Sequence, residues 1–144
     1  MLKVQLVIWT DSIAPKETEK EYAYVLATRR GWKYGDGICT GTWNRVVLTA
    51  IIEALNRIEE NAEVLIFTEN RFVLQMAAHH LKTWEQNEFK TTKGVTVKNE
   101  DLWRKIAVKK RSLKLVGKPV GANHRDWLRD ITEDKLMLGG KENR

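Results

Sequence analysis

The sequence predicts a mixed α/β domain, built on a five-stranded sheet with helices on both faces. Three observations predict it. Short apolar runs of strand length recur along the chain, and the first three are separated by short links and turn residues. The apolar spacing then changes to the i, i+3, i+4, i+7 pattern of an amphipathic helix. After that, strand and helix patterns alternate, which is typical of parallel strands joined through helices.

The first three strands should form an antiparallel meander, because only short links join them. Gly31 is expected to form the turn between the second strand and the third. Gly35 and Gly37 inside the third strand indicate a bulge or a close approach of another group to the backbone. The expected bounds of these strands are residues 3–10, 21–30 and 34–40.

The first helix is expected in the run TGTWNRVVLTAIIEALNRIEE, with either Thr42 or Asn44 capping its start. Residues 63–68 form a fourth apolar run. Because a helix connects this run to the preceding strands, it should pair in parallel with the first strand. The apolar side of the helix is expected to comprise Leu48, Ile51, Ile52 and Leu55.

The second half of the chain predicts a helix at residues 70–83, a polar and turn-rich stretch at 84–98, and a helix at 99–110 capped by Asn99. A fifth strand at 112–117 and a closing helix at 122–136 follow. The apolar positions expected for the second and the closing helix are Phe72, Val73, Met76, Ala77, Trp127, Leu128 and Ile131.

The length of 144 residues fits one domain, expected at residues 1–138 with a flexible tail at 139–144. No apolar run approaches the ~20 residues of a membrane span, and the first residues lack the pattern of a signal peptide. The single cysteine, Cys39, excludes an internal disulfide, so we expect a cytoplasmic protein. We expect a monomer, although the sequence leaves the oligomeric state open.

The positive charge is concentrated in one part of the chain. The formal net charge is +6, and residues 82–118 hold eleven Lys or Arg against four Asp or Glu. A basic segment of this kind is typical of a surface that binds a polyanion such as nucleic acid. A solvated surface without a partner would show the same composition, so both interpretations stay open.

Two acids follow the two strands that should be parallel neighbours. Asp11 comes after the first strand, and Glu69 comes after the fourth. Since the ends of such strands meet at one edge, the two carboxylates should lie close together, so that either one of them is protonated or the pair holds a cation. The basic segment nearby favours a hard divalent cation such as Mg²⁺ or Mn²⁺. The alternative is that each acid caps a following helix, which suits Glu69 better than Asp11.

Four short motifs in this order of elements resemble type 1 ribonuclease H. They are WTDS, TGTWNR, FTEN and VKNEDLW, and the resemblance covers about residues 3–130. It implies the ribonuclease H-like fold, with three antiparallel strands followed by parallel ones. It also implies cleavage of the RNA strand of an RNA/DNA hybrid, for which the family uses four carboxylates that bind two Mg²⁺ ions.

The acidic site departs from the family pattern. By resemblance the first acid is Asp11, the third is Glu69 in place of aspartate, and the fourth is Asp126, with Asp130 as the alternative. The second acid is replaced by Val47. The same three acids are thus the expected catalytic and metal-binding residues. The expected cofactor is Mg²⁺ or Mn²⁺, with one ion rather than two.

Neighbouring residues do not restore the missing acid. Glu53 lies six residues after Val47, about 9 Å along the helix and on a different face.

His124 stands beside Asp126 and is either the family's loop histidine, which assists product release, or a helix-start histidine.

The resemblance also identifies a set of nucleic-acid-binding residues. Short polar side chains at helix starts suit phosphate oxygens, and exposed lysines suit the polyanion. Trp84 either packs along the DNA strand or fills the core of a basic protrusion; Trp103 is expected in that core. The predicted binding residues are Thr42, Asn44, Trp84, Lys90, Lys93, Lys98 and Asn99.

The functional expectation is a protein that recognises RNA/DNA hybrid or duplex, with metal-dependent hydrolysis of the RNA strand weakened or lost. One alternative is a fully active hybrid ribonuclease. Another is a structural or interaction domain that does not bind nucleic acid.

Overall fold

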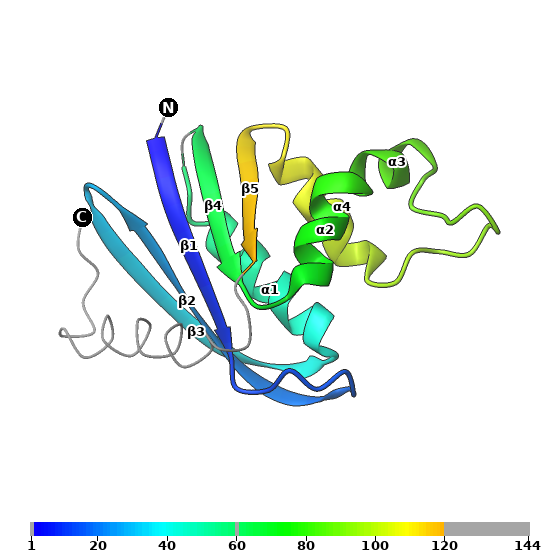
Figure 1. Ribbon diagram of the computed structural model, residues 1–144, viewed down its shortest axis with the longest axis horizontal. Helices are drawn as coiled ribbons and strands as arrows, with labels where there is room; N and C mark the ends of the chain where they lie inside the picture. The colour runs from blue at the N-terminus through cyan, green and yellow to red at the C-terminus, as the bar shows by residue number, and fades with distance from the viewer. Residues whose placement is uncertain (1, 60, 120–144) are drawn as a thin grey trace.

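A computed structural model describes residues 2–59 and 61–119, which form one mixed sheet with helices packed on it (Figure 1). The strand order is β3-β2-β1-β4-β5. The strands are β1 (Leu2–Thr10), β2 (Thr18–Thr28), β3 (Gly31–Gly41), β4 (Ala62–Thr68) and β5 (Leu113–Pro119). The helices in this part of the chain are α1 (Trp43–Leu55), α2 (Arg71–His79), α3 (Leu81–Gln86) and α4 (Glu100–Lys109).

The predicted pairing of the strands is confirmed. The β1–β2 and β2–β3 pairs are antiparallel, and β4 pairs in parallel with both β1 and β5. Only two residues, Arg29 and Arg30, join β2 to β3, and the first residue of β3 is Gly31 at φ 141°. The positive φ at this position favours glycine, as the predicted turn requires.

The hydrophobic core lies on one face of the sheet. Alternate β1 residues, Val4, Leu6 and Ile8, face it together with the apolar sides of α1, α2 and α4. The helices of residues 2–59 and 61–119 therefore cover the same face. The predicted closing helix belongs to residues 120–144, outside the described residues, so a helix on the second face stays a prediction.

The glycines of β3 make room for two tyrosines. A Cβ at Gly35 would lie 2.2 Å from the Tyr24 ring, and one at Gly37 would lie 2.4 Å from the Tyr22 hydroxyl. Both tyrosines come from the neighbouring strand β2 and are buried. The expected close approach to the β3 backbone is thus made by two aromatic side chains.

Three local predictions for the helices are wrong. The expected helix at 70–83 is two helices, α2 and α3, which meet at His80, and α3 continues to Gln86 within the stretch predicted as turns. Phe72 is 52% exposed, whereas Leu74 packs in the core against β5 near Gly117. Asn99 occupies the N-cap position of α4 in a left-handed conformation, and its side chain makes no capping bond.

In the described part of the chain, no helix is long and apolar enough to cross a membrane.

Candidate nucleic-acid interface and acidic edge

Asp11 and Glu69 follow neighbouring parallel strands and lie at the same edge of the sheet. The β1–β4 register pairs Val7 with Phe67, and its continuation sets Glu69 beside Trp9, two residues before Asp11. The Asp11 side chain is exposed, and its Oδ1 accepts a hydrogen bond of 3.0 Å from the backbone N–H of Glu21. Both acids therefore follow the ends of neighbouring parallel strands, as the sequence predicts.

Neither acid caps a helix. The cap of α2 is Asn70, whose Oδ1 accepts the N–H of Val73 at 2.9 Å. Asp11 leads into a loop and then β2, without a helix between them. Asn70 and not Glu69 thus occupies the N-cap position of α2, and the half-buried Glu69 side chain lies one residue before it.

The predicted third acid, Asp126, lies outside the described residues, as do Asp130 and His124. Within residues 2–59 and 61–119, no three His, Cys, Asp or Glu side chains come together as a metal site. Convergence of Asp11, Glu69 and Asp126 on one ion therefore stays a prediction.

Val47 lies in the core beside this edge. Its side chain is 1% exposed. Asn44, three residues earlier on α1, accepts a hydrogen bond of 2.9 Å from the Nδ2 of Asn70, the residue after Glu69. Since residues three apart are neighbours on a helix surface, Val47 lies one turn deeper on the side of α1 near the end of β4. A hydrocarbon side chain therefore occupies the position at which the resemblance predicts the second acid.

Glu53, on the same helix, is engaged by a tyrosine of β2. The Tyr22 hydroxyl donates a hydrogen bond to Glu53 Oε2. Burial of the Tyr22 ring and this bond to a carboxylate raise the pKa of Tyr22. Glu53 is thus part of a polar contact between α1 and β2, as its place on another helix face predicts.

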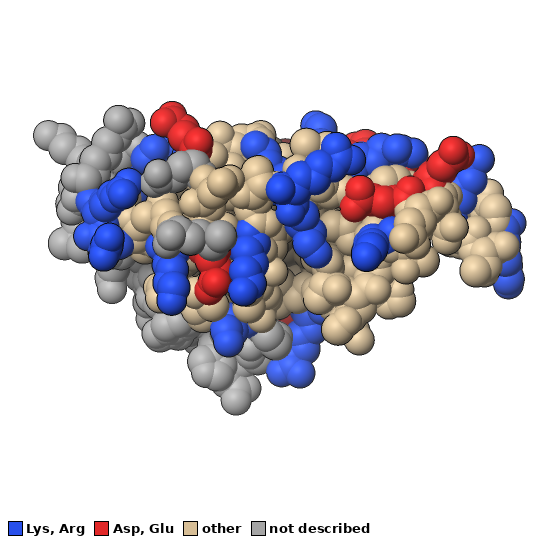
Figure 2. Space-filling view, turned by 90° about the horizontal axis from the view of Figure 1, so that it is seen from above, with Lys and Arg blue, Asp and Glu red and all other residues tan. Residues whose placement is uncertain are grey.

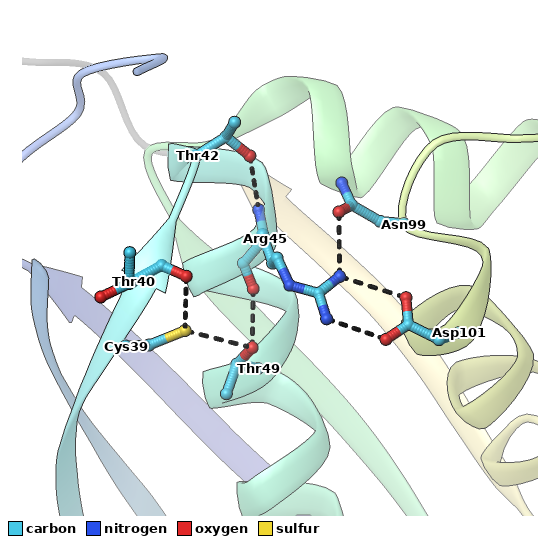
Figure 3. A network of polar contacts seen from close by, with 7 residues as sticks. All are labelled: Cys39, Thr40, Thr42, Arg45, Thr49, Asn99 and Asp101. Atoms are coloured by element: carbon cyan, nitrogen blue, oxygen red, sulfur yellow. Dashed lines mark hydrogen bonds and ion pairs between the residues drawn. The ribbon is translucent and has the colours of Figure 1, made fainter. Parts of the chain in front are cut away.

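The start of α1 carries two of the predicted binding residues. Thr42 is the N-cap, and its Oγ1 accepts the backbone N–H of Arg45 at 3.3 Å (Figure 3). Asn44 is half-buried and is held by Asn70. The bonds of Asn44 and of the Asn70 cap bring the starts of α1 and α2 together, with their backbone N–H dipoles at one surface.

Arg45 joins the start of α1 to the start of α4 (Figure 3). Its guanidinium donates two hydrogen bonds to the Asp101 carboxylate, of 3.1 and 2.8 Å. Its Nη1 also donates to Asn99 Oδ1 at 3.2 Å. The hydrogen bonds from Arg45 lower the pKa of Asp101. Asn99, predicted to bind nucleic acid, is thus oriented by an arginine.

The side chain of Lys20 is 0% exposed and fixes the loop that follows Asp11. Its Nζ donates to the carbonyl oxygens of Lys16 and Gly41 at 2.7 and 2.6 Å, and to Thr18 Oγ1 at 2.8 Å. Three acceptors match the three donors of the ammonium group. Lys20 therefore holds the β1–β2 loop against the residue before the α1 cap.

The segment from α3 to the start of α4, residues 81–99, forms the protrusion, and its outer loop projects beyond the sheet and helices (Figure 1). Trp103 is 2% exposed and forms its core, as predicted. Trp84 is half-buried and packs edge-on against Trp103, with ring centroids 5.3 Å apart. Phe89 is buried beneath the Arg104 guanidinium, which lies 4.6 Å from the ring centroid. Trp84 thus packs on the protrusion's core while part of its surface stays accessible.

The lysines of the protrusion are available to a ligand. Lys90, Lys93 and Lys98 are exposed, and no ion pair joins them to a carboxylate in the described part of the chain. The neighbouring acids are paired with arginines instead: Glu85 with Arg111, Glu100 with Arg104 and Asp101 with Arg45. The arginines thus offset most of the acidic charge that the sequence places near these lysines.

Thr42, Asn44 and Asn99 were predicted from the sequence to bind nucleic acid, and they lie at the adjoining starts of α1 and α4. The residues that orient them were not predicted. Arg45 and Asn70 could have been found, because they lie inside the motifs TWNR and FTEN. The role of Lys20 had no signal in the sequence, since a lysine at the start of a strand is normally exposed.

The chain is similar to ribonucleases H along most of its length. The RNase H family model matches residues 3–117. Ribonuclease H of Citrobacter koseri is 33% identical over 108 residues, which are 74% of this chain and 69% of the relative. Ribonuclease H of Rickettsia massiliae is 29% identical over 101 residues, which are 70% of this chain and 66% of the relative. The chain thus spans about two thirds of the length of these Rickettsia relatives.

Solved structures share the fold at lower identity. LC9-RNase H1, a type 1 RNase H with the type 2 active-site motif, has a TM-score of 0.69 at 14% identity; the match covers 99% of this chain and 75% of that one. The foamy viral protease-reverse transcriptase in complex with dsDNA has a TM-score of 0.66 at 18% identity, covering 92% of this chain and 89% of that one.

Proposed function

Because the chain belongs to the ribonuclease H family, we propose that it binds RNA/DNA hybrid and that its hydrolysis of the RNA strand is weakened or lost. The burial of Val47 in the hydrophobic core supports the second part. By resemblance, Val47 occupies the position of the family's second acid. A hydrocarbon neither coordinates a cation nor compensates its charge.

The remaining acids suit a hard divalent cation. Asp11 and Glu69 supply carboxylate oxygens at one edge of the sheet, and Asp126 is the proposed third ligand. With one acid fewer, the site balances less positive charge, so we propose one Mg²⁺ or Mn²⁺ ion rather than two. When bound, such an ion polarises a phosphate oxygen and lowers the pKa of bound water.

The binding surface is proposed to combine the helix starts with the protrusion. Backbone N–H groups and the side chains of Thr42, Asn44 and Asn99 suit phosphate and sugar oxygens. The exposed lysines of the protrusion add a sequence-independent attraction to the polyanion, and the accessible part of Trp84 can pack on a sugar or base.

Hybrid binding measured by fluorescence anisotropy across a range of NaCl concentrations tests this surface. Each lysine that contacts a phosphate contributes about one unit to the slope of log K against log salt. Replacing Lys90, Lys93 and Lys98 together by alanine should lower that slope by about three units. Lys3→Ala removes an equally exposed lysine at the amino end of β1 and should leave the slope unchanged.

Binding and cleavage are measured on the same hybrid, so the two parts of the proposal can fail separately. Salt-sensitive binding with slow cleavage agrees with both parts. Binding that is absent, or that is insensitive to salt, contradicts the first part and favours a domain that has lost nucleic-acid recognition.

A further inference from the structure

A pocket of about 500 Å³ opens at the end of the molecule opposite the acidic edge. It lies between the residues after α1 and the β2–β3 hairpin. We propose that it binds a small anionic amphiphile, a molecule with one apolar body and one carboxylate, sulfonate or phosphate group. This proposal does not depend on nucleic-acid binding.

The pocket exists because α1 is shorter than the strands it covers. The helix ends at Leu55, but the sheet continues to the start of β1 and the end of β2. Val4 and Leu26, both core residues of these strand ends, line the pocket. The pocket thus lies at the end of the core, beside the residues that follow α1.

The rest of the lining continues this apolar surface. Leu2 and Ile58 are half-buried and pack against the core, and Trp32 of the hairpin is 9% exposed. Ligand pockets in proteins are commonly 300–1,000 Å³ and mostly apolar, with a few polar groups that orient the ligand. The size and lining of this pocket agree with that pattern.

The charged groups at the pocket are predominantly positive. Of the described residues, Arg30, Lys33 and Arg57 line it together with one carboxylate, Glu59. Figure 2, which views this end of the molecule, shows Lys and Arg side chains predominating over Asp and Glu. A largely apolar cavity whose described charged residues are mainly cations favours a ligand whose apolar body carries a negative charge.

One of these cations is held in place by the protein. Arg57 Nη1 donates to the backbone carbonyl of Tyr34 at 2.8 Å and to the Tyr24 hydroxyl at 3.4 Å. This anchors the guanidinium between α1 and β3 at the pocket. Lys33, by contrast, is half-buried and makes no ion pair with a carboxylate in residues 2–59 and 61–119.

Two matched fluorescent probes test the proposal on the full chain. 1-Anilinonaphthalene-8-sulfonate carries an anionic group, and N-phenyl-1-naphthylamine is the same apolar body without it. We expect the sulfonate to bind about five-fold more tightly, because an exposed ion pair contributes up to about a factor of five. Lys33→Glu should remove this preference, whereas Lys93→Glu, the same change on the protrusion, should preserve it. Arg30→Glu provides a second test if Lys33→Glu fails to fold.

Amide NMR spectra then locate the bound probe. Octanoate, a carboxylate of different shape, and octyl phosphate should shift the same signals as the sulfonate, around Leu2, Leu26 and Gly31. Saturating RNA/DNA hybrid should not displace the probe. The proposal is overturned if neither probe binds, if both bind equally, if the shifts lie elsewhere, or if hybrid competes.

Discussion

Replacing Asn70 by alanine tests how the candidate interface is held together. Asn70 is 0% exposed and has two roles: its Oδ1 caps α2, and its Nδ2 donates to Asn44. Loss of an N-cap costs about 1 kcal/mol. Loss of one hydrogen bond between neutral groups costs about 1 kcal/mol more. The free energy of unfolding should therefore fall by about 2 kcal/mol.

Urea unfolding followed by circular dichroism measures this change. With an m-value of about 2 kcal/mol/M for a chain of this size, the midpoint should fall by about 1 M at unchanged m. Asn44→Ala removes only the second bond, so about half that shift is expected. Asn70→Asp retains an acceptor for the helix and, after rotation of the Asn44 amide, an acceptor for that side chain too. Because the position is 0% exposed, the added charge opposes this gain, so Asn70→Asp should still unfold at less urea than the natural protein.

The double variant completes the test. If the Asn44–Asn70 bond exists as described, the effects of the two alanine changes should be non-additive by about 1 kcal/mol. Simple additivity would show that the two side chains do not interact. An Asn70→Ala midpoint equal to that of the natural protein would refute the assignment of the cap as well.

Four further substitutions test other contacts of the fold. The Arg45–Asp101 pair is partly exposed, so Arg45→Met should cost less than about 1 kcal/mol, and 1 M NaCl should remove the difference. Because the pKa of Asp101 is lowered in the folded protein, ionised Asp101 stabilises the fold above the ordinary aspartate pKa, and this contribution is lost as the pH falls through the lower folded pKa. The unfolding free energies of the natural protein and Asp101→Asn, measured as a function of pH, should therefore converge at acid pH. Because the pKa of Tyr22 is raised in the folded protein, the natural protein should lose stability as the pH rises above the ordinary tyrosine pKa of about 10. Tyr22→Phe should lose less stability over the same pH range, and equal losses in urea unfolding at alkaline pH would argue against a buried phenol. Gly37→Ala places a methyl group against the Tyr22 hydroxyl and should cost about 1–3 kcal/mol in a thermal melt, with a smaller cost in a Tyr22→Leu background.

The sheet could be predicted from the sequence because each strand carries a local signal. Val4–Trp9 and Val64–Phe67 are apolar runs, and the helix between them requires a crossover that makes their strands parallel. The cap of α1 was predictable only as Thr42 or Asn44, because both are small polar residues at the start of the helical period, and the structure has Thr42 there.

Other features depend on tertiary contacts and had no local signal. The break at His80 divides a stretch whose apolar pattern looks continuous, and Phe72 lies on an exposed side of the first turn. Asn99 has the residue type of a cap, yet its side chain turns to Arg45, which is 54 residues away along the chain. Neither helix propensity nor the spacing of apolar residues predicts a contact between residues so far apart in the sequence.

The acidic edge was predicted in part. The positions of Asp11 and Glu69 follow from the topology of β1 and β4. Burial of Val47 could be predicted from its apolar side chain. Its position one turn from the Asn44–Asn70 contact could not be predicted from the sequence and is known only from the structure.

Restoring the acid by Val47→Glu tests the loss of hydrolysis most directly. A carboxylate at a 1% exposed position destabilises the fold unless a cation binds it. We therefore expect the variant to melt below the natural protein without metal and to regain stability with Mg²⁺, because binding to the folded state adds free energy. The same Mg²⁺ addition should shift the natural protein less.

Hybrid cleavage is then measured for both proteins in Mg²⁺ and in Mn²⁺. A lost ligand that raises the barrier by about 4 kcal/mol slows the reaction about 10³-fold, so the natural protein should turn over far below about 1 s⁻¹. The Val47→Glu protein should cleave faster. Turnover of the natural protein at about 1 s⁻¹ or above, with no gain in the variant, would contradict the proposed loss of hydrolysis.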